Sequence, residues 1–173
     1  MYELKVLAYS GTQAFEIKHF GSRYISHTFT IPQSAGNGLT ALRMDPATGE
    51  LSFVPALTHA ANGATVITIK RNGGGMYMTG QLERRFDDLS GHWAREDIEF
   101  MANKLLVRGV DVHRFAPDRY MTRAEFIVLI ARALGLDVSG TTVEFSDVPL
   151  SKWYTGAVAA AVEAGLITGY SDN

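Results

Sequence analysis

The sequence predicts an α+β fold with segregated halves: an antiparallel, β-sandwich-like domain over residues 1–80, followed by an all-α region. Two observations predict it. Up to about residue 80, apolar residues alternate with polar ones in short runs separated by turns rich in Gly and Pro. Beyond Gln81, apolar residues recur at helical spacing. We therefore interpret the charged segment 81–85 as the linker between two domains.

The composition is that of a globular protein. The chain has 173 residues, 46% of them hydrophobic and 20% charged, with a net charge of −2, so nothing favours nucleic-acid binding. The absence of cysteine excludes disulfides and thiolate metal sites. No apolar run reaches the roughly 18 residues that a membrane-spanning helix needs. No signal peptide precedes Tyr2, so in a secreted parent protein this chain would be an internal piece.

Seven short strands are expected in the first half, because alternation and β-branched or aromatic residues coincide there. The segment 45–50 is an example of the turns that separate these strands. Pro46 suits the second position of a tight turn, and Gly49 supplies a positive φ. The expected strands lie at 3–8, 14–19, 24–31, 39–44, 51–54, 65–70 and 76–79.

The clearest helix in the second half begins after Thr122. Thr122 and Glu125 have the spacing of a capping box, and Gly135 supplies a left-handed terminus, so a helix is predicted from about Arg123 to Leu134. Arg123 lies in the first turn, where the helix dipole disfavours a cation. It either points into solvent, pairs with an acid, or joins the helix N-terminus in binding an anion.

Two apolar stripes with helical spacing are copies of each other. Residues 86–89 match 145–148, Trp93 matches Trp153, and 106–109 match 166–169. This order predicts an internal repeat of about 60 residues. The first helical stripe is expected to end at Gly109 and the second at Gly165. Because the second copy stops at Asn173, we expect the chain to be a fragment cut inside its second repeat.

Several short motifs together resemble the S-layer homology (SLH) domain family of bacterial cell-surface proteins, with 86–140 as one full repeat and 145–173 as a truncated second one. The motifs are Phe86-x-Asp88, His92-Trp93-Ala94, Phe115-x-Pro117, Thr122-Arg123-Ala124-Glu125-Phe126 and Arg132-Ala133-Leu134-Gly135. The resemblance implies helix–loop–helix repeats. It also implies non-covalent binding to secondary cell-wall polysaccharide, often pyruvylated, which anchors secreted proteins at the extracellular face of the cell wall or in an S-layer.

The resemblance also implies site residues. Arg123 would contact the polysaccharide carboxylate, and Trp93, Trp153 and Asp172 are further implied contacts. A Trp at helical spacing is equally a core residue, so that interpretation stays open for both tryptophans. Glu125 is expected to serve as the capping partner of Thr122. His113 stands where the family prefers Gly, so a strained positive φ is expected there.

Nothing in the sequence indicates catalysis, a metal site or a cofactor, because the five histidines lack ligand spacing and the acidic residues at 87–99 lack that of a calcium loop. The predicted function is anchoring to cell-wall polysaccharide. The alternative is a structural module whose β domain contacts other S-layer subunits, without carbohydrate binding by this fragment. A third option is a carbohydrate-binding β domain, which would display a row of exposed aromatics from among Tyr24, Phe29, Phe53 and Tyr77.

Overall fold

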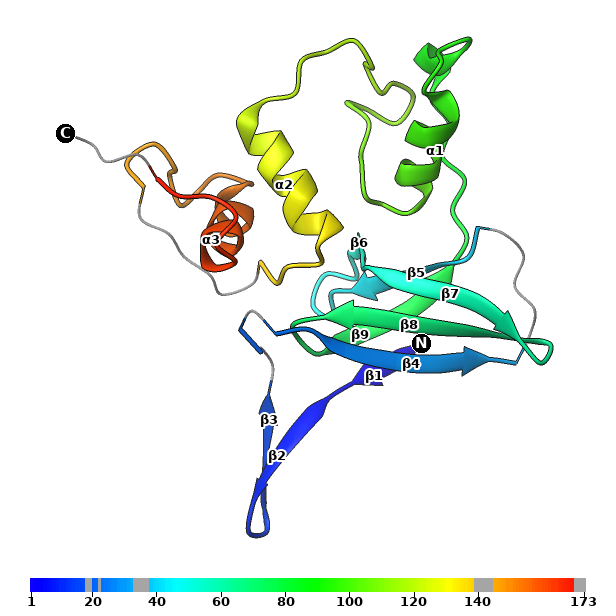
Figure 1. Cartoon of the computed structure of the whole chain (residues 1–173). Helices are drawn as coiled ribbons and strands as arrows, with labels where there is room; N and C mark the ends of the chain where they lie inside the picture. The colour runs from blue at the N-terminus through cyan, green and yellow to red at the C-terminus, as the bar shows by residue number, and fades with distance from the viewer. Residues whose placement is uncertain (18–19, 22, 33–37, 139–144, 170–173) are drawn as a thin grey trace.

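The structure is a computed structural model that describes residues 1–17, 20–21, 23–32, 38–138 and 145–169. Within these residues, the strands precede Gln81 and the helices follow Phe86 (Figure 1). The mixed α+β class with antiparallel sheets is therefore confirmed. Between the helices, long stretches have no regular secondary structure, so the label all-α describes only part of the second half.

The described residues of the β half form two larger antiparallel sheets and a separate hairpin. The first sheet has the order β1–β9–β5–β6, and the second has the order β4–β8–β7. The hairpin pairs β2 with β3. The strands are β1 Tyr2–Leu4, β2 Val6–Ser10, β3 Gln13–Ile17, β4 Ile25–Ile31, β5 Thr40–Met44, β6 Leu51–Phe53, β7 Ala56–Ala61, β8 Ala64–Arg71 and β9 Gly75–Gly80.

One hydrophobic cluster receives residues from both larger sheets. Ala41 and Tyr77 enter it from the first sheet, and Ile67 and Ile69 enter it from β8 of the second. The pattern of β8 explains this, because every second residue from Thr65 to Arg71 is buried. A complete sandwich of two sheets goes beyond this shared cluster and stays a prediction.

Strand β7 is absent from the sequence-based expectation, because its residues show neither alternation nor β-branched enrichment. It forms by pairing with β8 in continuous register, from Ala56 opposite Ile69 to Ala61 opposite Ala64. The connecting residues Asn62 and Gly63 both have positive φ, 51° and 77°. Asn-Gly between two strands is a strong hairpin signal, so this dipeptide was the clue that could have predicted β7.

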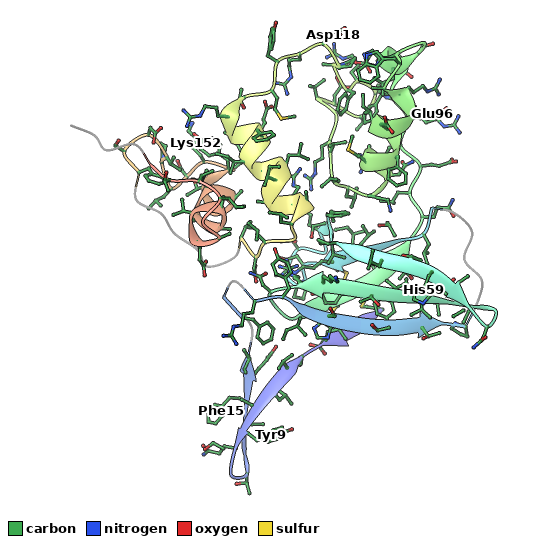
Figure 2. The ribbon with its side chains drawn as sticks, in the orientation of Figure 1. Tyr9, Phe15, His59, Glu96, Asp118 and Lys152 are labelled. Carbon is green, nitrogen blue, oxygen red and sulfur yellow. The ribbon has the colours of Figure 1, made fainter. Side chains whose placement is uncertain are left out.

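The hairpin formed by β2 and β3 projects from the body of the β half (Figure 1). The first predicted strand is thus divided: β1 pairs with β9, and β2 turns back onto β3. The side chains of Tyr9 and Phe15 stand out from this hairpin and are 69% and 53% exposed (Figure 2). The hairpin therefore presents apolar surface that the described residues do not cover.

Over residues 81–138 and 145–169, the second half forms one short 3₁₀ turn and three α-helices: η1 Asp87–Leu89, α1 Arg95–Asn103, α2 Arg123–Ala133 and α3 Thr155–Glu163. The expected end of the first stripe at Gly109 is wrong. The left-handed residue that follows α1 is Leu105, with φ 61°, and Gly165 holds the corresponding place after α3, with φ 69°. Leu105 accepts this conformation because its side chain is buried.

Two small hydrophobic clusters lie in the helical half. Phe86, Leu89, Ile98 and Ala102 form the cluster of the first repeat, which Phe115 covers. Val128 and Ala131 of α2 pack against Ala157 of α3, so that α2 and α3 form a helix pair. This pair joins the two repeats.

Polar contacts join the helical half to the β half. Arg71 at the end of β8 lies 3.4 Å from Asp137, and both side chains are almost fully buried. The Tyr24 hydroxyl donates to the carbonyl of Leu134 at 2.7 Å, and Arg108 pairs with Glu50 at 2.7 Å. The contacts of Leu134 and Asp137 hold the C-terminal end of α2 against the β half, and the Arg108 pair holds the loop after α1.

Candidate functional site

The N-terminus of α2 is built by the capping box. The Thr122 hydroxyl accepts the Glu125 backbone N–H at 3.2 Å, and the Glu125 carboxylate accepts the Thr122 backbone N–H at 2.8 Å. Arg119 adds an ion pair to the same carboxylate at 2.7 Å. The Arg119 hydrogen bond, followed by those from Thr122, lowers the pKa of Glu125 to about 2. Glu125 thus belongs to the helix cap, which fixes Arg123 in the first turn.

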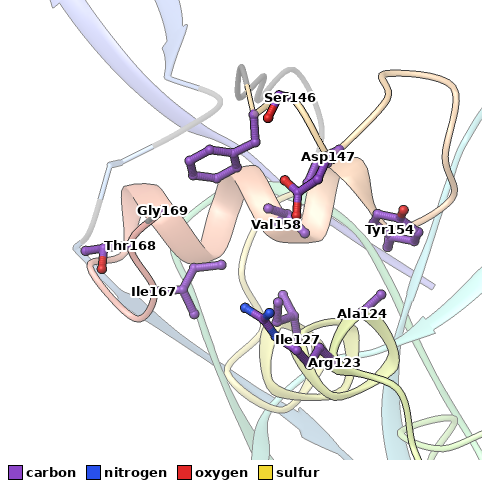
Figure 3. A pocket seen from close by; sticks show the side chains of 12 residues that line it. Arg123, Ala124, Ile127, Ser146, Asp147, Tyr154, Val158, Ile167, Thr168 and Gly169 are labelled. Carbon is purple, nitrogen blue, oxygen red and sulfur yellow. The ribbon is translucent and has the colours of Figure 1, made fainter. Parts of the chain in front are cut away.

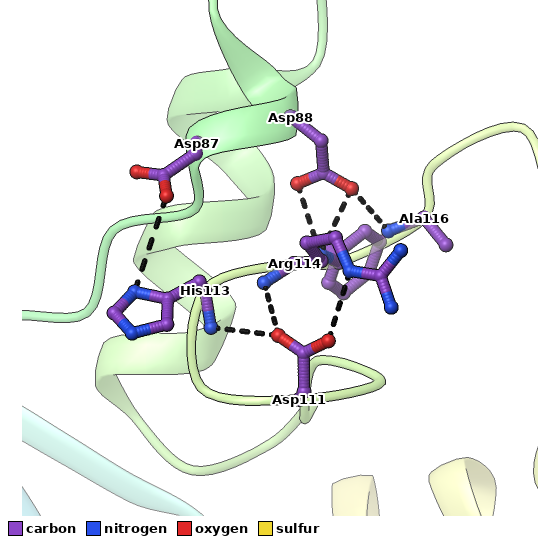
Figure 4. Close-up of polar contacts among 7 residues, drawn as sticks. Asp87, Asp88, Asp111, His113, Arg114 and Ala116 are labelled. Carbon is purple, nitrogen blue, oxygen red and sulfur yellow. Dashed lines mark hydrogen bonds and ion pairs between the residues drawn. The ribbon is translucent and has the colours of Figure 1, made fainter.

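The loop that leads to α2 is held by two aspartates (Figure 4). Asp88 accepts the backbone N–H groups of Phe115 and Ala116 at 3.0 and 2.7 Å, which lowers the pKa of Asp88. Asp111 accepts the backbone N–H of His113 at 2.9 Å. The expectation of a strained His113 is wrong. The positive φ falls at Ala116, 61°, beside the Asp88 carboxylate that holds it.

A pocket of about 600 Å³ lies between α2 and the second repeat. Arg123 and Ile127 line it from α2, and Asp147, Tyr154 and Thr168 line it from the second repeat. Figure 3 shows the Arg123 and Asp147 side chains reaching into the same space from opposite walls. The structure therefore places Arg123 in a groove between the two repeats.

The lining of this pocket combines the groups that sugar recognition requires. Arg123 offers planar donors suited to a carboxylate, and Asp147 with the hydroxyls of Ser146 and Thr168 can exchange hydrogen bonds with sugar hydroxyls. Ile127 and Val158 supply apolar walls. Asp147 is not among the site residues predicted from the sequence. Its place one repeat after Asp88 was the available signal, but its contact with the α2 groove arises only from the packing of the repeats.

The predicted site residues do not share one pocket. Trp93 is 89% exposed and stacks on His92 with ring centroids 5.7 Å apart. Trp153 is 65% exposed and lines a different groove, on the other side of α2. The core interpretation of both tryptophans is therefore wrong. Asp172 lies outside the described residues.

The aromatic row proposed for the β half does not form. Tyr77 is fully buried in the core, and Tyr24 is engaged with Leu134 at the joint with the helical half. Phe29 packs on the same core cluster. Three aromatics that face the core or the joint cannot form a sugar-binding platform.

Comparison with known proteins identifies the second half. Residues 85–127 and 144–173 match the model of the S-layer homology domain. These residues belong to the SLH family. The match indicates a cell-surface or cell-wall-associated location and supports a role in cell-surface anchoring. No solved structure matches the chain.

Relatives with SLH sequence include enzymes and surface proteins. An amylopullulanase of Thermoanaerobacterium thermosulfurigenes is 32% identical over 129 residues, which are 75% of this chain and 7% of the enzyme. An S-layer-related protein of Niallia circulans is 44% identical over 54 residues, 31% of this chain and 3% of that protein. A cellulosome-anchoring protein of Acetivibrio thermocellus is 33% identical over 82 residues, 47% of this chain and 18% of that protein.

The chain thus spans less than a fifth of the length of these relatives. The alignment to the amylopullulanase must include part of the β half, since fewer than 129 residues follow Gly80. The described helices contain no segment long and apolar enough to cross a membrane. In the part of the chain that the structure describes, no three His, Asp or Glu side chains gather into a group that could hold a metal ion.

Proposed function

We propose that this chain anchors its parent protein by non-covalent binding of an acidic cell-wall polysaccharide in the groove between α2 and the second SLH repeat. The observation that carries the proposal is the position of Arg123, in the first turn of a capped helix and at the wall of a 600 Å³ pocket. A pyruvyl or uronic carboxylate would accept a bidentate pair of hydrogen bonds from Arg123. The α2 N-terminus would add its partial positive charge.

Co-sedimentation with purified bacterial sacculi tests this function. Wild-type chain is expected to pellet with intact sacculi and to stay soluble with sacculi stripped of secondary polymer. Arg123→Gln removes one charge-assisted contact and is expected to weaken binding on the order of tenfold or more. Arg95→Gln, which alters an arginine paired with Glu99 on α1, is the matched control and should bind like wild type. Equal binding by Arg123→Gln would reject the site, and equal pelleting with stripped sacculi would reject the function.

We also propose the domain organisation that this function uses. Residues 1–80 act as a sandwich-like domain, 81–85 as the linker, 86–140 as the first repeat and 145–173 as the start of the second. Limited proteolysis with trypsin should cut first at Arg84 or Arg85, of which Arg85 has a 72% exposed side chain. First cuts inside either half would reject this division.

A second candidate function is protein–protein assembly through the β half. The exposed apolar side chains of Leu7, Tyr9 and Phe15 on the β2–β3 hairpin favour it. Tyr9→Ser together with Phe15→Ser should then abolish concentration-dependent association in analytical ultracentrifugation while leaving the binding to sacculi unchanged. An association that survives both substitutions would reject the hairpin as the contact.

A further inference from the structure

Two arginine side chains enter the space between the two larger sheets of the β half. Arg43 on β5 is paired with Tyr77 on β9, and Tyr77 is fully buried in the cluster that both sheets share. Residues directly opposite each other on paired strands point to the same face of the sheet, so Arg43 points toward this cluster as well. Arg71 comes from the other sheet, where every second residue of β8 from Thr65 on is buried. Two cations thus approach each other from facing sheets.

The two guanidinium groups are unequally compensated. The Arg71 side chain is 6% exposed and forms an ion pair with Asp137 at 3.4 Å, whereas Arg43 forms none with any residue that the structure describes. Burial, followed by the charge of Arg43, lowers the pKa of Arg71. The charge of Arg43 also reaches Asp45, but that carboxylate already accepts two backbone N–H groups of its own turn. The pair of arginines therefore lacks a second counter-charge in contact with it.

Tyr77, which lies beside both arginines, does not supply this charge. Burial is the main cause that raises the pKa of its hydroxyl, so the phenol stays neutral. The hydroxyl group donates its proton to the carbonyl of Gly73 at 3.3 Å. The balancing negative charge has to come from elsewhere.

Both arginines also have an unused hydrogen-bond donor. The Nε atoms of Arg43 and Arg71 are buried and have no hydrogen-bond partner among the described residues. A buried donor without a partner is costly, and a buried charge without one is more so, and a single anion would relieve both.

Gly75 leaves room for a small ligand beside Arg43. A Cβ at position 75 would lie 3.3 Å from Arg43 Nε and 3.6 Å from the Tyr77 hydroxyl oxygen. Because glycine has no such atom, a space bounded by these two side chains is left between the sheets. It suits an anion of one atom rather than a phosphate or a sugar acid.

We propose that a halide-sized monovalent anion, with chloride as the common one in solution, binds between Arg43 and Arg71 and accepts hydrogen bonds from their Nε–H groups. The anion supplies the second counter-charge, and Asp137 remains the partner of Arg71. Since Asp137 follows α2, the bound anion stabilises the joint between the β half and the helical half. This site is separate from the polysaccharide groove and does not depend on it.

The test is the melting temperature of the full chain in a chloride series at constant ionic strength, with gluconate as the balancing anion. Gluconate is too large for the space beside Gly75 and controls for screening by salt. A ligand that binds only the folded chain raises its melting temperature, here by about 3–6 °C when chloride is roughly tenfold above its dissociation constant. Bromide is expected to act as chloride does. A melting temperature that does not depend on which anion is present overturns the site.

Variants assign the effect to the arginine pair. Arg43→Gln removes the cation that lacks a partner, so the chloride dependence should vanish, and stability in gluconate should not fall below that of wild type. Arg85→Gln alters an arginine whose side chain is 72% exposed and should keep the full dependence. Equal chloride dependence in the two variants overturns the site.

A direct location of the ion completes the test if Arg43→Gln does not fold. Crystals of the wild-type chain soaked in bromide should give an anomalous-scattering peak between Arg43 and Arg71, and the absence of that peak overturns the site. None of these outcomes bears on binding to sacculi, so the proposed function stands or falls separately.

Discussion

The Phe86 ring lies so close to Gly109 that a Cβ at position 109 would stand 2.5 Å from Phe86 Cε1. The second repeat has the same relationship, with the Phe145 Cε1 atom 2.5 Å from a Cβ at Gly169. In each repeat, a phenylalanine ring thus packs directly against a glycine that follows the first helix. This contact gives Gly109 a role even though α1 ends earlier, at Asn103.

Gly109→Ala is therefore expected to destabilise the first repeat by about 1–3 kcal/mol, since an added methyl group in a packed core forces backbone shifts. The carbonyl oxygens of Arg114 and Asp111 would lie 2.5 and 2.6 Å from the new Cβ, and backbone atoms cannot rotate away as a side chain can. Urea denaturation measures the loss. Gly80→Ala is the control, because its nearest neighbour is a Leu42 methyl at 4.0 Å. Equal stability of the two variants would contradict the contact.

Asp88→Asn should lower the melting temperature, because an amide replaces one of the two oxygens that accept the N–H groups of Phe115 and Ala116. The positive φ of Ala116 would lose the group that holds it. Circular dichroism during heating is a sufficient measurement. The neighbouring Asp87→Asn is the matched control, since the Asp87 carboxylate is 85% exposed and, among the described residues, forms its one ion pair with His113, at 3.9 Å. A larger effect at Asp87 than at Asp88 would show that the Asp88 carboxylate does not hold this loop.

The α2 cap predicts a pH dependence. The pKa of Glu125 is lowered from 4.5 to about 2 in the folded chain, so its carboxylate stabilises the fold above about pH 4.5. That contribution is lost as the pH falls from about 4.5 toward 2, where the folded state also takes up the proton. The difference in melting temperature between wild type and Glu125→Gln should shrink over this window. A difference independent of pH between 6 and about 2 would refute the ionised cap.

Asp137→Ala should cost about 3–5 kcal/mol, because it leaves the guanidinium of Arg71 buried and without this partner. The side chains of Arg71 and Asp137 are only 6% and 10% exposed, so water cannot replace the lost carboxylate. Glu83→Ala is the control, since the Arg85–Glu83 pair is exposed and 3.8 Å apart, and such pairs contribute at most about 1 kcal/mol. Equal costs in urea denaturation would indicate that the joint does not depend on this pair.

Local sequence determined the elements whose signals lie within a few residues of each other. Thr122 and Glu125 form their cap from a spacing of three residues, and β8 follows from its own alternation. The internal repeat could also be recognised from the sequence, where Phe86 and Phe145 occupy equivalent positions. In the structure these two residues make equivalent contacts. These features need no knowledge of what packs against them.

Tertiary structure decided the features that depend on a partner distant in sequence. Leu105 takes a left-handed conformation that costs roughly 1–2 kcal/mol, but burying its side chain contributes about 1.5–3 kcal/mol, so packing prevails over propensity. Trp153 has the spacing of a core residue, yet only the packing of α3 on α2 shows that its outer face is left uncovered. Likewise, the sequence supplied Arg123 and Arg132 on one helix. Only the contacts on either side of α2 assign them to two different grooves.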